Sequence, residues 1–237
     1  MNTTERFFKI SGTEYERYAR AAWQRYINAP SRAEASLAAV ADIKVERVLD
    51  IGCGAGHELI PFILHRRAWG VGLDVVPETG RAGFELFGTI APQARVNFVR
   101  GAAEALPFRD GHFDVVVCRL ALPYMENDRA LAEMARVIRR GGALLLKIHH
   151  AVYYLRKIAN GLSNRDGLSM VHAVRVLLAG SIYYSTNRQP RTRLTGGETF
   201  QTRSLLRRKL SPLGMLIESE LPDSNSATPS FVIRKSA

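Results

Sequence analysis

The sequence has few cysteines, and it contains no long apolar run. Its two cysteines, Cys53 and Cys118, provide neither a disulfide framework nor the spacing of metal ligands. We therefore expect a protein of a reducing compartment, the cytoplasm, that holds no metal ion. No stretch is apolar over the roughly 20 residues that a membrane span requires, and the first residues lack the apolar run of a signal peptide.

Acidic residues are also scarce. The 22 Asp and Glu residues stand against 33 Lys and Arg residues, which gives a formal net charge of +11. Much of this excess lies between residues 151 and 210, where 11 basic residues stand against two acidic ones, a net charge of +9. An anionic ligand or surface fits such a region, although an arginine-rich face that is merely solvated is the commoner case for exposed helices.

The length, the composition and the order of apolar patterns indicate one large α/β domain. The chain has 237 residues, of which 46% are apolar and 23% charged, as in globular proteins. Strand-like apolar runs alternate with helical patterns, which favours a parallel sheet. The predicted strands are 45–51, 68–73, 96–99, 113–118, 143–148, 215–220 and 230–234. The predicted helices are 11–28, 32–41, 57–65, 77–88, 128–140 (stopped by Gly141-Gly142), 151–159, a second insert helix ended by Gly180, and 200–210.

The segment Val48–Gly56, Val-Leu-Asp-Ile-Gly-Cys-Gly-Ala-Gly, is the most informative part of the chain. A buried strand runs directly into three glycines at alternate positions, and a helix follows. Glycines allow a tight turn and close approach of a ligand, and a helix N-terminus attracts phosphate-like or nucleotide groups. Asp74 ends the next strand, eighteen positions after Gly56, where a carboxylate can accept hydrogen bonds from ribose hydroxyls.

The order of these residues separates two classes of nucleotide site. Dinucleotide sites favour Gly-x-Gly-x-x-Gly, whereas here the third glycine comes one residue earlier and His57 takes its place. With Asp50 included, Asp-x-Gly-x-Gly-x-Gly resembles the first motif of class I S-adenosylmethionine-dependent methyltransferases, in particular the methyltransferase type 11 or UbiE-like group. Residues 101–108 and 113–142 resemble later segments of the same family, so the resemblance covers roughly 45–148.

The resemblance implies a fold, a cofactor and a set of contacts. The fold is a doubly wound seven-stranded sheet, mostly parallel with an antiparallel last strand, and the cofactor is S-adenosyl-L-methionine. The implied cofactor-binding residues are Tyr18 (or its neighbour Tyr15), Asp50, Gly52, Cys53, Gly54, Gly56, Asp74, Val75, Ala102, Ala103, Glu104 and Arg119. Ala102 departs from the family pattern, which has an aspartate there for the adenine amino group. Backbone groups at Ala102 and Ala103, or the Glu104 side chain, must then recognise adenine.

Three side chains are candidates for chemistry on the acceptor. Tyr124 follows the fourth strand, and His149 and His150 follow the fifth, at the edge where ligands bind in such sheets. An ordinary histidine pKa near 6.5 suits removal of a proton from the acceptor. Because side chains alternate along a strand, only one histidine can point into the cleft. The alternative is that both histidines cap the strand and bond nearby backbone.

We expect a single methyltransferase domain in four parts. These are N-terminal cap helices (1–42), a cofactor-binding core (43–150), a helical insert that covers the acceptor (151–197) and the end of the sheet (198–237). The basic insert favours an anionic small-molecule or glycan acceptor, methylated on oxygen or nitrogen. RNA methylation is an alternative, although the chain lacks aromatic residues interleaved with basic ones. A non-catalytic module that binds only the cofactor, a partner or a membrane surface is another.

Overall fold

The computed structural model describes residues 30–192 and 196–236, together with residues 17, 19, 21–24, 26 and 28. Tyr15 and Tyr18, which the sequence predicted to contact the cofactor, lie outside the described residues, as does Arg193 of the basic insert.

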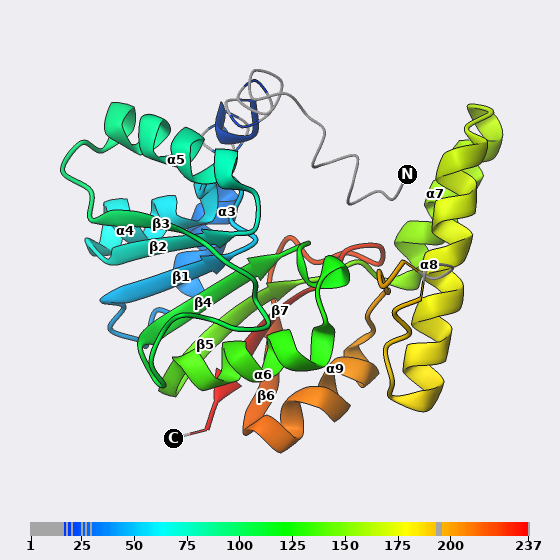
Figure 1. Ribbon diagram of the computed structural model, residues 1–237. Helices are drawn as coiled ribbons and strands as arrows, with labels where there is room; N and C mark the ends of the chain where they lie inside the picture. The colour runs from blue at the N-terminus through cyan, green and yellow to red at the C-terminus, as the bar shows by residue number, and fades with distance from the viewer. Residues whose placement is uncertain are drawn as a thin grey trace.

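Seven strands form one sheet in the order β3-β2-β1-β4-β5-β7-β6 (Figure 1). β7 is antiparallel to both β5 and β6, and every other neighbouring pair is parallel. This confirms the predicted sheet. The strand order reverses between β1 and β4, and the crevice at such a reversal is where open α/β sheets bind ligands. The strands are β1 (Arg47–Ile51), β2 (Trp69–Asp74), β3 (Val96–Arg100), β4 (Phe113–Arg119), β5 (Ile138–Lys147), β6 (Met215–Glu220) and β7 (Ser230–Lys235).

Helices cover both faces of the sheet, because the central strands are apolar on both sides. Val115 and Val117 belong to the apolar cluster under the first helices, whereas Val116 belongs to the cluster on the opposite face. One face carries α3 (Pro30–Ala38), α4 (Ile60–Arg66) and α5 (Pro77–Ile90), and the other carries α6 (Asn127–Val137) and α9 (Arg203–Leu210). The described residues also contain three 3₁₀ turns: η1 (His57–Leu59), η2 (Leu122–Tyr124) and η3 (Ser211–Leu213).

The insert is a helical hairpin. α7 (Ala151–Ser163) starts directly after the end of β5, and α8 (Gly167–Thr186) returns alongside it. The pair stands beside the sheet rather than over one of its faces (Figure 1). Among the residues that the structure describes, no helix combines the length and the apolar character needed to cross a membrane.

Two glycine signals in the sequence were misread as helix ends. α6 ends at Val137, and β5 begins at Ile138, so Gly141 and Gly142 lie inside a strand. A Cβ at Gly142 would lie 2.7 Å from the backbone oxygen of Asp114, which explains a glycine there. α8 likewise continues through Gly180, where a Cβ would lie 2.2 Å from a ring atom of Phe200. Both glycines permit close packing and do not terminate a helix.

Candidate functional site

The glycine loop lies between β1 and η1 and is anchored to the end of β2. The backbone N–H of Gly52 donates to the carbonyl of Leu73 at 2.8 Å. Gly52, Gly54 and Gly56 have φ angles of 66°, 52° and 75°, in the left-handed region that favours glycine. A Cβ at Gly52 would also lie 2.4 Å from the Cβ of Ala121, which follows β4. Backbone conformation and packing against the β4 loop therefore both require glycine at position 52.

The Asp74 carboxylate links this loop to the end of β2. Its Oδ2 accepts the backbone N–H of Gly54 and its Oδ1 accepts that of Val76, both at 3.0 Å. Burial raises the pKa of Asp74, although these two hydrogen bonds favour the ionised form. Each carboxylate oxygen has a further lone pair. The carboxylate can therefore hold the loop and accept ribose hydroxyls at the same time.

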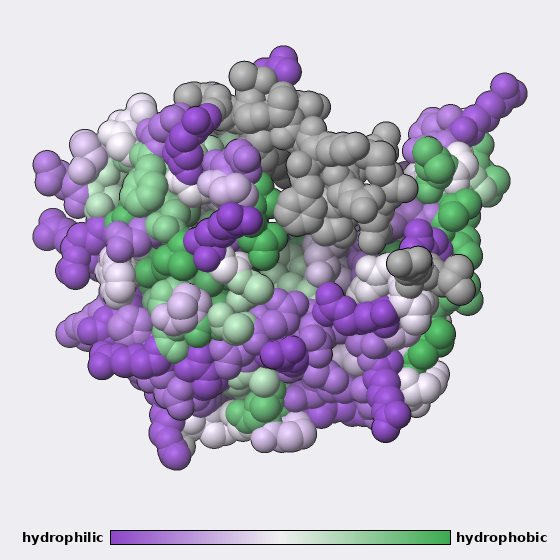
Figure 2. Space-filling view, viewed as in Figure 1, coloured by the Kyte–Doolittle hydropathy of each residue, from purple (hydrophilic) through white to green (hydrophobic). Residues whose placement is uncertain are grey.

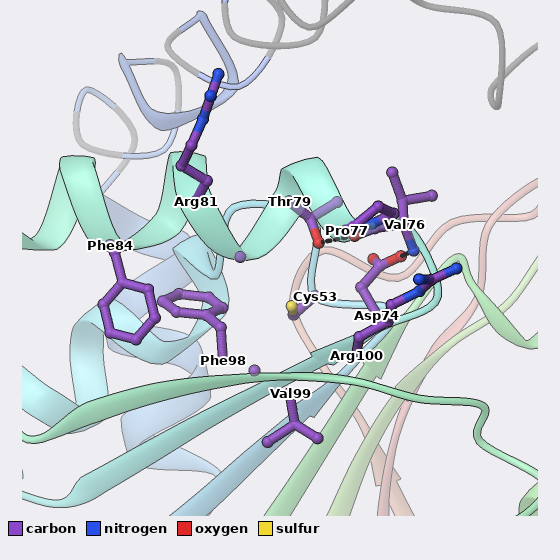
Figure 3. Close-up of a pocket in the computed structure, with 12 residues that line it drawn as sticks. Cys53, Asp74, Val76, Pro77, Thr79, Arg81, Phe84, Phe98, Val99 and Arg100 are labelled. Atoms are coloured by element: carbon purple, nitrogen blue, oxygen red, sulfur yellow. Dashed lines mark hydrogen bonds between the residues drawn. The ribbon is translucent and has the colours of Figure 1, made fainter.

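A cavity of about 240 Å³ opens beside Asp74, between the ends of β2 and β3 and the start of α5 (Figure 3). The Cys53 thiol lies in its wall, and burial raises the pKa of that thiol. Phe84 and Phe98 form the apolar end of the cavity, with ring centroids 5.1 Å apart. An apolar wall next to a carboxylate is the combination that a nucleoside requires.

Several other residues predicted to contact the cofactor do not line this cavity. Val75 follows Asp74 and is exposed, and Ala102 and Ala103 lie in the loop after β3. The Glu104 carboxylate accepts the backbone N–H of Glu126 at 2.7 Å, at the start of α6. Glu104 is thereby engaged in joining the β3 loop to α6.

Two described residues that precede β1, Trp23 and Tyr26, contact the glycine loop and the residue after it. The indole Nε1 of Trp23 donates to the carbonyl of Ala55 at 3.0 Å, and the ring of Tyr26 lies 5.5 Å from that of His57. Trp23 was missed in the sequence reading. Ala19, Trp23 and Tyr26 are separated by four and three positions, so they share one helical face, and all three side chains are buried. This spacing is the sequence signal that could have identified Trp23.

A buried cluster of charges lies beyond the ends of β4 and β5. The Arg119 Nε lies 3.0 Å from Oε1 of Glu58, and its Nη2 contacts Asp223. Arg32 also contacts Glu58, and the Lys147 Nζ lies 2.8 Å from Oδ2 of Asp223. Burial opposes ionisation of Asp223, but the hydrogen bond from Lys147 and the charge of Arg119 hold its pKa below the usual value. Glu58 and Asp223 carried no signal in the sequence.

Asp50 provides a test of whether these residues fit S-adenosylmethionine. Its side chain is 2% exposed, and its Oδ2 has no hydrogen-bond partner among the described residues. Burial, with the nearby charge of Asp74, raises the pKa of Asp50 to about 7, while Arg32 and Arg119 oppose the shift. A buried acceptor without a donor is costly. An ammonium donor at this position, such as the cofactor carries, would remove that cost, so the residues present fit the group.

His149 lies in an aromatic and polar cluster just beyond the end of β5. Its ring stacks on Tyr153, with centroids 4.1 Å apart, and the Tyr124 ring meets it edge-on at 6.4 Å. The Tyr154 hydroxyl lies 3.4 Å from its Nδ1 and donates to Oε1 of Glu198 at 2.8 Å. Burial lowers the pKa of His149 to about 4, although the charge of Glu198 opposes this. His149 is therefore neutral at physiological pH.

His150 is placed differently. Its Nδ1 accepts the backbone N–H of Val152 at 3.4 Å, so the side chain caps the N-terminus of α7. The sequence alternative in which a histidine bonds nearby backbone thus describes His150. Of the two histidines, the structure places His149 close to Tyr124.

The chain returns from the insert across the ends of β4 and β5. The backbone N–H of Gln201 donates to the carbonyl of His149 at 3.0 Å, and that of Thr199 donates to Pro123 at 3.3 Å. The Asn127 amide donates to the Thr199 hydroxyl at 2.8 Å. Residues 198–202 therefore join the insert to the β4 and β5 loops, a connection that no sequence pattern indicated.

Comparison with known proteins agrees with this geometry. Residues 49–146 match a protein-family sequence model described as "Methyltransferase domain". "Uncharacterized methyltransferase YcgJ" of Bacillus subtilis is 38% identical over 109 residues, which are 44% of this chain and 41% of that protein. "Ubiquinone/menaquinone biosynthesis C-methyltransferase UbiE" of Shewanella piezotolerans is 33% identical over 103 residues, 42% of this chain and 41% of that protein. The chain thus spans about two fifths of the length of these relatives.

A solved structure shows that the fold is shared. A putative S-adenosyl-L-methionine-dependent methyltransferase from Methanococcus maripaludis aligns with a TM-score of 0.62 and 16% identity, over 97% of this chain and 95% of its own. The region that the family model matches contains the glycine loop, Asp74 and Arg119. Residues 49–146 are accordingly similar to the methyltransferase domain family, and the chain shares the fold of an S-adenosyl-L-methionine-dependent methyltransferase.

Proposed function

We propose that the chain transfers a methyl group from S-adenosylmethionine to a small-molecule acceptor bound at the ends of β4 and β5. The observation that carries this proposal is the Asp74 carboxylate, which holds Gly54 and Val76 at 3.0 Å beside the cavity. A carboxylate clamped to a glycine loop suits a ribose, and the family match supports the cofactor.

The residues that would hold the cofactor divide into two groups. Asp74 would accept the ribose hydroxyls, with Phe84 and Phe98 closing the far end of the cavity. Asp50 would accept a hydrogen bond from the ammonium group through its Oδ2, which has no hydrogen-bond partner among the described residues. Burial raises the pKa of Asp50, but the nearby charge of Arg119 opposes this shift and so favours the ionised carboxylate. When bound, the cofactor supplies a methyl group on a sulfonium, which is already a good leaving group.

Alignment of the acceptor is then the main task of the protein. Tyr124 and Tyr153 would contact the acceptor with their rings, because both flank His149 at the strand ends. His149 would accept the acceptor's proton when the acceptor is protonated. Its neutral state at physiological pH keeps a ring nitrogen available for this, while a low pKa limits its strength as a base. Tyr154 and Glu198 orient the ring through Nδ1.

The insert indicates the chemical class of the acceptor. The hairpin covers the side of the site next to His149, and its basic residues favour an anionic small molecule or glycan. One relative is named a C-methyltransferase. Acceptor pools for this chain should therefore include carbon nucleophiles as well as oxygen and nitrogen nucleophiles.

Calorimetry followed by an activity screen tests the proposal. We expect S-adenosylmethionine to bind, and S-adenosylhomocysteine to form with at least one acceptor pool. Binding without turnover on any pool would support the non-catalytic module, and turnover only with RNA would support the other alternative. Tight binding of NAD in place of S-adenosylmethionine would contradict the cofactor assignment.

A further inference from the structure

The outer face of α8 carries a continuous apolar stripe. Leu168, Val171, Val174, Leu178 and Ile182 are separated by three or four positions, so they share one side of the helix. All five are exposed, with between 44% and 80% of the side chain accessible. Figure 2 shows apolar residues along the outer edge of the α7–α8 hairpin. Scattered apolar residues are normal on protein surfaces, whereas a stripe along four turns of one helix is not.

The inner face of the same helix is apolar as well. Ala173, Val176, Ala179 and Tyr183 are buried there, and Gly180 lets Phe200 approach closely. Residues 167–186 contain one Arg or Lys, Arg175, and no Asp or Glu. A helix that is apolar on all sides is normally covered on all sides. The inner face is covered by α7 and Phe200, so the outer face calls for a partner.

The charges around the stripe indicate what that partner is. Arg165 lies in the turn before α8, Arg188 follows its end, and Arg175 lies next to the stripe at mid-helix. The carboxylate of Asp166 is occupied by the backbone N–H of Ser169 at 3.0 Å. Residues 151–188 contain five Arg or Lys against one acidic residue, a net charge of +4. Positive charge at both ends and in the middle of an apolar stripe complements an anionic, partly apolar surface.

We propose that the outer face of α8 docks on an anionic phospholipid membrane. The helix lies along the surface, with the stripe at the level of the acyl chains and Arg165, Arg175 and Arg188 among the headgroup phosphates. Arg175 lies beside the stripe, midway along its length, which suits a helix in the plane of the interface, where its charge can reach the headgroups. The exposed Leu155 and Leu162 of α7 extend the apolar surface of the hairpin.

The arrangement of charge disfavours a second copy of the chain as the occupant. In a two-fold pair of α8 helices centred on the stripe, the midpoint of Leu168 to Ile182 falls at residue 175. Each Arg175 would then face its own copy, and like charges in contact are unfavourable. Two chains of net charge +11 would also repel one another before contact.

Binding of the full chain to lipid vesicles tests the proposal without any activity measurement. We expect the chain to cosediment with phosphatidylcholine vesicles containing about 30% phosphatidylglycerol, and to bind pure phosphatidylcholine vesicles at least about tenfold more weakly. The variant Val171→Ser/Leu178→Ser should bind the anionic vesicles at least about tenfold more weakly than the native chain. Both side chains are 60% exposed, so the variant should fold normally, which circular dichroism checks.

A matched control separates the stripe from general surface apolarity. Leu64→Ser/Leu216→Ser removes two exposed apolar side chains outside the hairpin, and its vesicle binding should equal that of the native chain. Arg165→Gln/Arg175→Gln should weaken the dependence on salt. Absence of binding to anionic vesicles, or equal binding by the Val171→Ser/Leu178→Ser variant, would overturn the proposal. So would a native dimer in sedimentation velocity that this variant converts to monomer, because a second copy would then cover the stripe.

Discussion

Replacing Asp74 with alanine removes the carboxylate that clamps the glycine loop. The native side chain accepts the backbone N–H groups of Gly54 and Val76 at 3.0 Å each, and in the proposed complex it also accepts a ribose hydroxyl. A hydrogen bond to a charged group contributes about 1.5–3 kcal/mol. Loss of the ribose contact alone should therefore raise the Kd for S-adenosylmethionine about 10- to 150-fold.

Two further variants divide this loss into its parts. Asp74→Asn keeps one acceptor oxygen without the charge, so its Kd should fall between the native value and that of Asp74→Ala. Glu78→Ala removes an exposed carboxylate from the first turn of α5 and changes the net charge equally, so its Kd should stay at the native value. Because Asp74 also holds two backbone groups, Asp74→Ala should lower the free energy of unfolding of the unliganded chain as well.

Isothermal titration calorimetry with S-adenosylmethionine and S-adenosylhomocysteine measures these constants, and urea unfolding measures stability. The placement of the ribose on Asp74 would be refuted by a folded Asp74→Ala variant whose Kd stays within about threefold of the native one. A loss of stability without a loss of affinity would assign Asp74 to the loop alone.

Three other predictions follow from the same site. His149→Ala should lower turnover about 10²–10⁴-fold and remove the acidic limb of the pH–rate profile. His150→Ala should keep turnover within a few-fold and lower the free energy of unfolding by about 0.5–1 kcal/mol, because it removes the cap of α7. Equally small effects of the two variants on the pH–rate profile would exclude a histidine base. Asp50 has its pKa raised from 3.8 to about 7 by burial, so the folded state binds more protons than the unfolded state, and native stability should fall as pH rises from about 4 through 7. Asp50→Asn should lack this fall in urea unfolding measured across that pH range, and an unchanged pH dependence would contradict the raised pKa. Arg191→Gln should raise KM for an anionic acceptor and weaken its salt dependence with cofactor affinity intact; unmoved acceptor kinetics would make Arg191 a solvated surface residue.

Neighbouring residues were sufficient to predict the strands, because the apolar pattern of a strand is local in the sequence. The central strands are covered on both faces, so each reads as an apolar run such as Val115–Cys118, and all seven strands were predicted. Glycine was a poor guide elsewhere. At Gly142 and Gly180 its role is set by a close neighbour, Asp114 or Phe200, that is distant in the sequence. A rule based on adjacent residues therefore placed two helix ends wrongly.

The sequence by itself determined the sheet and the pairing of the glycine loop with Asp74, because Gly54 and Asp74 are separated by only 20 positions and adjacent parallel strands bring them together. Tertiary structure decided the rest. Arg119 contacts Asp223 although the two residues are 104 positions apart. Asp223 also reaches Lys147, and only because β7 packs beside β5. Tertiary packing also buries His149 and leaves His150 to cap α7, and the packing of α8 against α7 and Phe200 turns one apolar face of α8 inward and leaves the other exposed. Burial and pairing over such distances depend on which surfaces the folded chain presents to one another, and no local pattern encodes them.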